Sequence, residues 1–180
     1  SRGGGLALDL ALAHPGHVAG LVLVAPSASG YPEGEWVSAE AELEQDDMIE
    51  QAARAGDLDL VNRLEVHYWL DGVEQPEGRV EGPPRELMIE MNGRALQARP
   101  VGTMVRQPAI WPRLAAIDVP VVVVAGEYDL PGMGRLCRDL VSAVPNGRLE
   151  VIEGTAHCPS LDQPERLNRV VLDSVGSITR

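Results

Sequence analysis

The apolar run from Val119 to Gly126 constrains the fold of this chain more than any other stretch. It reads Val-Pro-Val-Val-Val-Val-Ala-Gly, with no alternation between apolar and polar residues. A strand with one face in water alternates, so a strand of this kind is covered on both faces. We therefore expect residues 119–126 to form a central strand of a parallel sheet with helices on both sides.

Other strand and helix patterns alternate with this run along the chain. The expected strands are residues 18–26 and 149–152, and the expected helices are residues 3–14, 132–144 and a last one from Pro164 onward. Strands that alternate with helices predict the α/β class, with a parallel sheet and right-handed crossovers. Three strands are too few to cover this much apolar surface, so we expect the first strands of the sheet to precede Ser1 and to be missing here.

Residues 27–109 interrupt the alternation, and their pattern is mostly helical. Between Glu33 and Glu50 there are eight acidic residues and no basic one, which is typical of a solvated helical face. We expect one helix to start with a cap at Asp47 and to stop at Gly56, a second to follow, and a third to start at Pro83-Pro84. The predicted organisation is thus a core of residues 1–26 and 110–180 with a helical insertion between them.

Composition and charge limit the partners of the protein. A length of 180 residues holds one ordinary core, and the net charge of −12 argues against nucleic acid, whose binders place cations against phosphates. No apolar run reaches the roughly 18–20 residues of a membrane span. Cys137 and Cys158 have no metal or redox spacing. We expect a soluble, cytoplasmic protein with a small-molecule substrate and no metal, nucleic acid or membrane partner; the oligomeric state stays open.

The chain opens with Ser1-Arg2-Gly3-Gly4-Gly5 and runs directly into the helix expected over residues 3–14. Glycine-sized neighbours let backbone and substrate come close to a serine on a sharp turn, so Ser1 is interpreted as a nucleophile. The helix dipole and the free N–H of Arg2 would stabilise the negative charge on an attacked carbonyl oxygen. Because this helix is apolar on nearly every face, we expect it to be enclosed by protein.

Two further polar residues follow the ends of predicted strands. Asp129 comes three residues after residues 119–126, and His157 lies in the loop after residues 149–152. In an open parallel sheet, active groups gather at the carboxyl ends of the strands, so Ser1, Asp129 and His157 are expected at one edge. His157 would take the serine proton, and Asp129 would hold the imidazole. Glu127 is the rival acid, although its earlier position suits packing at the strand end.

These motifs resemble the α/β-hydrolase superfamily. Ser1-Arg2-Gly3-Gly4 is similar to the second half of the Gly-x-Ser-x-Gly nucleophile elbow, residues 122–129 to the strand that bears the acid, and residues 154–160 to the histidine loop. The resemblance implies a Ser-Asp-His triad, an oxyanion donor at Arg2, a lid or cap made by residues 27–109 and no need of a cofactor. A serine nucleophile, rather than an aspartate, implies acyl transfer to water.

The expected activity is cleavage of a small ester, lactone or related acyl compound. A carbon–carbon bond hydrolase and a proline-type aminopeptidase of the same fold remain alternatives, as does a non-catalytic domain in which the three residues do not converge. An enzyme using its own N-terminal amine as base is a fourth reading, against which the strand–helix alternation argues. Because we expect the N-terminal half of the fold to precede Ser1, we expect activity of the longer protein rather than of this chain alone. Candidates for an apolar substrate wall are Trp36, Trp69, Met88 and Met91, although packing within the insertion explains them equally well.

Overall fold

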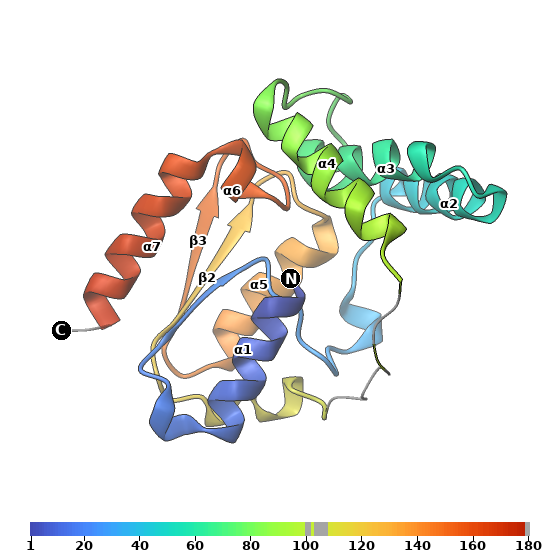
Figure 1. Cartoon of the computed structure of the whole chain (residues 1–180). Helices are drawn as coiled ribbons and strands as arrows, with labels where there is room; N and C mark the ends of the chain where they lie inside the picture. The colour runs from blue at the N-terminus through green and yellow to red at the C-terminus, as the bar shows by residue number, and fades with distance from the viewer. Residues whose placement is uncertain (100–101, 103–107, 179–180) are drawn as a thin grey trace.

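A parallel sheet of three strands lies at the centre of the computed structural model, which describes residues 1–99, 102 and 108–178 (Figure 1). The strands lie in the order β1 (Leu21–Val24), β2 (Val121–Gly126) and β3 (Gly147–Ile152). Every residue of β2 is buried, and β2 pairs with β1 on one side and β3 on the other. The prediction that this run forms the central strand is therefore confirmed.

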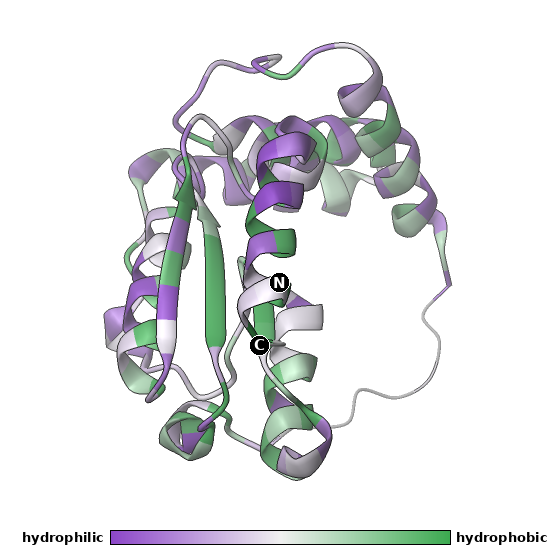
Figure 2. Ribbon diagram, turned by 90° about the vertical axis from the view of Figure 1, so that its left-hand side faces the viewer, coloured by the Kyte–Doolittle hydropathy of each residue, from purple (hydrophilic) through white to green (hydrophobic). Residues whose placement is uncertain are grey.

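Helices cover both faces of the sheet. Leu8 of α1 (Arg2–Ala13) and Leu140 of α5 (Pro131–Ala143) share one apolar cluster with Val123 of β2. Leu167 of α7 (Pro164–Ile178) packs on the opposite face against Val124 of β2. Figure 2 shows strongly apolar strand segments among helices of mixed polarity. This three-layer arrangement confirms the parallel α/β fold class.

The first helix is less enclosed than its composition predicts. Its buried residues are Gly5, Leu8 and Ala11, which lie three residues apart and form one stripe. Leu6 and Leu10, on other faces, are 62% and 50% exposed. The prediction of an enclosed helix is therefore wrong for the described residues, because an apolar side chain is buried only where a neighbouring element covers it.

The first strand is also shorter than the apolar run that predicts it. Of residues 18–26, only Leu21–Val24 belong to β1. Its residues alternate between buried and half-buried because the two faces of β1 are covered unequally. Leu21 and Leu23 lie in the large apolar cluster that includes α1, whereas Val22 and Val24 are only partly buried on the face of α7. The preceding Pro15–His17 form a 3₁₀ turn, and further 3₁₀ turns among the described residues are Glu33–Glu35 and Trp111–Ala116.

A helical segment, which we define as residues 40–97, lies beyond the carboxyl ends of the strands (Figure 1). It contains α2 (Glu40–Ala55), α3 (Leu58–Val66), a π-helical turn (His67–Gly72) and α4 (Pro83–Gln97). Within residues 1–99, 102 and 108–178, the helices are all too short or too polar to cross a lipid bilayer.

The expected boundaries of these helices were partly right. The stop at Gly56 (φ +75°) and the start at Pro83 are confirmed. The start at Asp47 is wrong, because α2 already begins at Glu40, where acidic side chains favour the positive end of the helix dipole. The acidic run is also not wholly solvated, since Glu42 is buried. Residues 100–101 and 103–107, which fall in the expected insertion, lie outside the described residues.

Candidate active site

The central contact at the carboxyl end of the sheet joins His157 and Asp129. His157 Nδ1 lies 2.9 Å from Asp129 Oδ2 and 3.1 Å from Oδ1. The side chains are only 12% and 1% exposed. An ionised carboxylate can only accept, so Nδ1 donates to Asp129 and the neutral ring keeps Nε2 as its acceptor. A histidine held in this tautomer can take a proton from an alcohol.

The backbones of the loops that carry this pair are bonded to each other. Tyr128 N, next to Asp129, donates to Thr155 O at 2.8 Å. At the end of β2, a Cβ on Gly126 would lie 2.1 Å from Ala156 O, so only glycine permits this approach. Asp129 Oδ1 also accepts from Leu130 N at 2.8 Å, which holds the carboxylate at the start of α5. These contacts fix the two loops close together.

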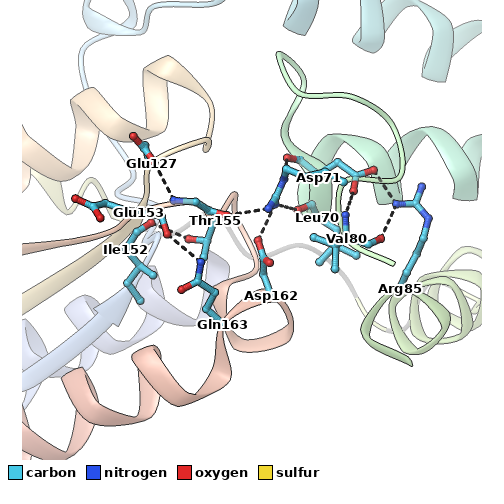
Figure 3. A network of polar contacts seen from close by, with 12 residues as sticks. Leu70, Asp71, Val80, Arg85, Glu127, Ile152, Glu153, Thr155, Asp162 and Gln163 are labelled. Atoms are coloured by element: carbon cyan, nitrogen blue, oxygen red, sulfur yellow. Dashed lines mark hydrogen bonds and ion pairs between the residues drawn. The ribbon is translucent and has the colours of Figure 1, made fainter. Parts of the chain in front are cut away.

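Glu127 binds the same loop at another point. Its Oε2 accepts a hydrogen bond from Gly154 N at 2.8 Å (Figure 3). Gly154 has φ +74° and lies three residues before His157. Glu127 therefore contacts the backbone of the histidine loop, whereas Asp129 contacts the imidazole.

Ser1 lies at the N-cap position of α1, and its hydroxyl makes no capping hydrogen bond. Its carbonyl oxygen accepts from Gly4 N at 3.0 Å and from Ser27 N at 3.0 Å. A Cβ on Gly4 would lie 2.6 Å from Pro26 Cβ, so the helix start and the end of β1 pack closely only with glycine there. Arg2 is the first residue of α1, and its N–H is one of the first four that have no acceptor within the helix.

Ser1 reaches the same end of the sheet as the His157–Asp129 pair. Ser27 follows β1, and Figure 1 shows the start of α1 at the end toward which the strands point. No hydrogen bond joins the Ser1 hydroxyl to His157 in the described structure. Two of the three predicted residues are thus in direct contact, and the third lies at the same rim.

A cavity of about 470 Å³ opens beside Ser1. Its wall is mainly apolar with several hydroxyl groups, and no basic residue is among the described residues that line it, which are Ser1, residues 27–33, Trp36, Met133 and Leu136. Trp36 lies against α5, where a Cβ on Gly132 would be 2.3 Å from Trp36 Cε2. Burial, then a hydrogen bond to Asp139, raises the pKa of Tyr31 to about 12, so this lining phenol is neutral at physiological pH.

The expected substrate-wall residues occupy different environments. Trp69 contacts the histidine directly, with 4.7 Å between the Trp69 and His157 ring centroids. Trp36 lines the cavity, whereas Met88 packs against the buried cluster that contains Leu70. Met91 lies on α4 with 56% of its surface exposed, and it is not among the described residues that line the cavity.

The cysteines are free thiols. Burial raises the pKa of Cys158 to about 11, with a smaller contribution from the negative charge of Asp129. Burial also raises the pKa of Cys137 to about 12. Both thiols are therefore protonated at neutral pH and are poor nucleophiles. No group of three His, Cys, Asp or Glu side chains that could hold a metal ion occurs among residues 1–99, 102 and 108–178.

Sequence reasoning missed two charged residues next to the site, Asp71 and Arg79. Asp71 is fully buried in the π-helical turn, and Arg79 reaches from the following loop to Gly154 O at 2.8 Å. Arg79 lies in a loop rich in proline and glycine, and Asp71 lies in the turn that precedes this loop. No periodic pattern marks either side chain as buried. The only local signal was an aspartate next to a glycine, which is typical of any turn.

The arrangement matches known proteins over nearly the whole chain. The sequence model of the Alpha/beta hydrolase family matches residues 1–170. A Bacillus subtilis (strain 168) protein assigned as 2-succinyl-6-hydroxy-2,4-cyclohexadiene-1-carboxylate synthase is 26% identical over 190 residues, covering 99% of this chain and 64% of that protein.

Solved structures show the same fold. A thermophilic esterase from Thermogutta terrifontis has a TM-score of 0.66 and 20% identity, over 98% of this chain and 62% of the esterase. MenH from S. aureus has a TM-score of 0.61 and 22% identity, over 98% of this chain and 66% of MenH. The chain thus spans just under two thirds of the length of each of these proteins. With a family model matched over residues 1–170 and this shared fold, the chain belongs to the Alpha/beta hydrolase family.

Proposed function

We propose that this protein is a serine hydrolase that cleaves a small ester, lactone or related acyl compound through Ser1, His157 and Asp129. The observation that supports this most strongly is the shielded hydrogen bond between His157 Nδ1 and Asp129 Oδ2, 2.9 Å long. It lies at the carboxyl end of the sheet, where α1 presents Ser1. Membership of the Alpha/beta hydrolase family and the esterase fold of the Thermogutta terrifontis structure agree with this activity.

In the first half of the reaction, His157 Nε2 removes the proton of the Ser1 hydroxyl as the oxygen attacks the acyl carbon. Asp129 stabilises the imidazolium that forms, because its carboxylate already accepts the Nδ1 proton. The negative charge moves to the carbonyl oxygen, where the N–H of Arg2 and the positive end of α1 stabilise it. The bond to the leaving oxygen then breaks, and His157 gives that oxygen its proton.

The second half releases the acyl group to water. His157 Nε2 takes a proton from water, the resulting oxygen attacks the acyl carbon, and the proton returns to Ser1 Oγ as the acyl–enzyme bond breaks. The side chains that carry out these steps need no further proton donor. Tyr31 and Cys158 nearby are held protonated, so they do not compete as bases.

In this proposal, residues 27–109 form a cap over the site. The helices α2, α3 and α4 lie beyond the carboxyl ends of the strands, and Trp69 of this segment lies on the ring of His157. The cavity next to Ser1 has an apolar wall without a basic side chain among its described residues, which favours an uncharged acyl group over a carboxylate.

The test is hydrolysis of a panel of chromogenic esters, lactones and prolyl amides by protein containing this chain. Replacing Ser1 by Ala or His157 by Gln should lower kcat by about 10⁴–10⁶-fold, since members of a triad act as one unit. Asp129→Asn should lower kcat by about 10⁴-fold, because the imidazole loses the partner that fixes its tautomer. The matched control is Ser160→Ala, which removes an exposed hydroxyl three residues from His157 and should leave kcat unchanged.

Activity that survives Ser1→Ala would contradict the proposal, as would a panel without any turnover. Turnover confined to prolyl amides would instead identify an aminopeptidase of the same fold.

A second candidate comes from the Bacillus subtilis relative, whose name is that of a 2-succinyl-6-hydroxy-2,4-cyclohexadiene-1-carboxylate synthase. The product in that name carries carboxylate groups, and the cavity beside Ser1 offers them no basic side chain among its described residues. Formation of the named product by this protein, with ester hydrolysis absent, would favour this candidate over the first.

A further inference from the structure

We propose that Arg79, a residue of the helical segment, is a positioning residue that holds the two loops bearing Asp129 and His157 against each other. The expected effect of Arg79 on kcat rests on the proposed function, whereas its expected effect on the geometry of the loops does not. The proposal stands on four hydrogen bonds, one ring contact and the way in which Asp71 directs the arginine.

The guanidinium of Arg79 is almost fully used by protein partners. Its NH1 donates to Gly154 O at 2.8 Å, and its NH2 donates to Asp162 Oδ2 at 2.6 Å and to Leu70 O at 2.7 Å. Its Nε donates to Asp71 O at 2.8 Å. A guanidinium has five N–H donors, so these four bonds leave one. With only 18% of its side chain exposed, Arg79 is suited to join protein segments rather than to bind a substrate anion.

These bonds connect the helical segment to the loop of the proposed base. Gly154 lies three residues before His157, and Asp162 ends α6 (Pro159–Asp162), which begins two residues after His157. In Figure 3, these dashed contacts meet between Leu70 and Asp71 on one side and Asp162 and the backbone next to Thr155 on the other. Arg79 therefore holds the histidine loop on both sides of His157.

The same guanidinium touches the loop of the proposed acid. Arg79 Cζ lies 5.4 Å from the ring centroid of Tyr128, the residue before Asp129. An arginine above an aromatic face is attracted by the negative charge of the ring face. One side chain from outside the sheet thus contacts both loops whose relative position sets the His157–Asp129 distance.

Asp71 directs Arg79 by holding the residues on either side of it. Its Oδ2 accepts from Gly78 N at 2.9 Å, and its Oδ1 accepts from Val80 N at 3.0 Å. Burial alone would raise the pKa of Asp71, but hydrogen bonds from Val80, Arg85 and Gly78 outweigh burial and lower it. Asp71 is therefore ionised, and its charge fixes the backbone from which Arg79 projects.

The turn beside Asp71 also packs on both loops. A Cβ on Gly72 would lie 2.6 Å from Tyr128 O and 3.4 Å from Ala156 Cβ. Tyr128 directly precedes Asp129 in the sequence, and Ala156 directly precedes His157. A displacement of the turn would therefore be transmitted to both members of the pair.

The first measurement is the position of the His157 ring. In the wild type, the Trp69 ring, 4.7 Å from the His157 ring, should shift the ring C–H NMR resonances of His157. These resonances are assigned by their loss in His157→Gln. In Arg79→Ala these resonances should move toward those of a solvated histidine, and added guanidinium ion should restore them. The exposed His14 and His17 serve as internal references, and Arg94→Lys is the matched control because Arg94 is exposed and pairs with Glu90.

The second measurement separates kcat from KM on the most active chromogenic ester. Arg79→Lys should lower kcat by about 100-fold with KM within about twofold, because a displacement of ~1 Å in a catalytic group can cost this much. A lysine ammonium is a single point donor and cannot reach four acceptors in the plane of a guanidinium. If the wild type hydrolyses no substrate, the proposed function fails, and the NMR result alone decides the role of Arg79.

Asp162→Asn keeps Arg79 and removes only the charge of its partner, so it remains informative if Arg79→Ala does not fold. Arg79→Lys should shift the His157 resonances in the same direction as Arg79→Ala, and Asp162→Asn should shift them in that direction too, but less. The proposal is overturned if folded Arg79→Lys and Asp162→Asn both show wild-type His157 resonances and keep kcat within about twofold.

Discussion

The sheet and the helical segment are each stabilised in a different way. Each residue of β2 is buried, and α5 buries Leu136, Cys137 and Leu140 against the sheet. In contrast, α4 has no fully buried residue in the described structure and leaves Leu87 and Met91 exposed. The comparison teaches that apolar burial builds the sheet layers, whereas the helical segment depends on a few anchoring contacts.

Those anchors lie where the segment meets the histidine loop. A small apolar cluster of Val66, Leu70 and Val80 packs against Leu161 of α6. Next to it, Asp71 accepts from the backbone and from Arg85 NH1 at 2.7 Å. The site lies between two regions that differ in how much apolar surface they bury. Substitutions in the two regions should therefore change the free energy of unfolding by different amounts.

The largest expected difference is between two leucines. Leu140→Ala removes a fully buried side chain between α5 and β2 and should lower the free energy of unfolding by about 2–5 kcal/mol. Leu87→Ala on the exposed face of α4 should lower it by less than about 1 kcal/mol. Urea unfolding of both variants measures the difference. Equal losses would mean that α4 is packed as tightly as the core, which would break the comparison.

The second prediction concerns the charge of Asp71. At pH 7, Asp71→Asn should lower the free energy of unfolding by about 1.5–3 kcal/mol, the range for hydrogen bonds to a charged group. The folded-state pKa of Asp71 is lowered from 3.8, so its stabilising contribution is present above that value and is lost as pH falls through the lower folded pKa.

Urea unfolding at several pH values should therefore show a constant difference between wild type and Asp71→Asn near neutrality and a shrinking one below about pH 4. The control is Asp59→Asn, an exposed carboxylate in the first turn of α3, which should change stability by less than about 1 kcal/mol. A difference that grows on acidification would contradict the role given to Asp71.

The third prediction compares two glycines with similar backbone angles. Gly72 (φ +94°) and Gly78 (φ +84°) both cost strain when replaced by alanine. Only at Gly72 would the new Cβ also meet Tyr128 O at 2.6 Å, whereas at Gly78 it would meet no atom within 4 Å. Gly72→Ala should therefore destabilise by about 1–3 kcal/mol more than Gly78→Ala in urea unfolding. Equal effects would show that the turn does not press on the acid-bearing loop.

Local patterns predicted the elements that have periodic sequences. The unbroken run of β2, the buried stripe of α5 and the starts of α4 and α7 at prolines all follow from rules that act over a few residues. The cap of α2 was predicted eight residues late, at Asp47 instead of Ala39, because the first turns of the helix carry acidic residues without an apolar stripe. The exposure of α1 was missed because burial depends on the elements that surround a helix.

The amino-acid order alone set the α/β class and placed Asp129 and His157 after successive strands, because strand polarity in a parallel sheet sends both to one edge. Only the folded chain decided that Asp129 meets the imidazole while Glu127 binds Gly154 N. Only the folded chain also brought Arg79 to Gly154, 75 residues away. Periodicity is a property of neighbours in the chain, whereas these contacts depend on how loops from distant segments pack in space.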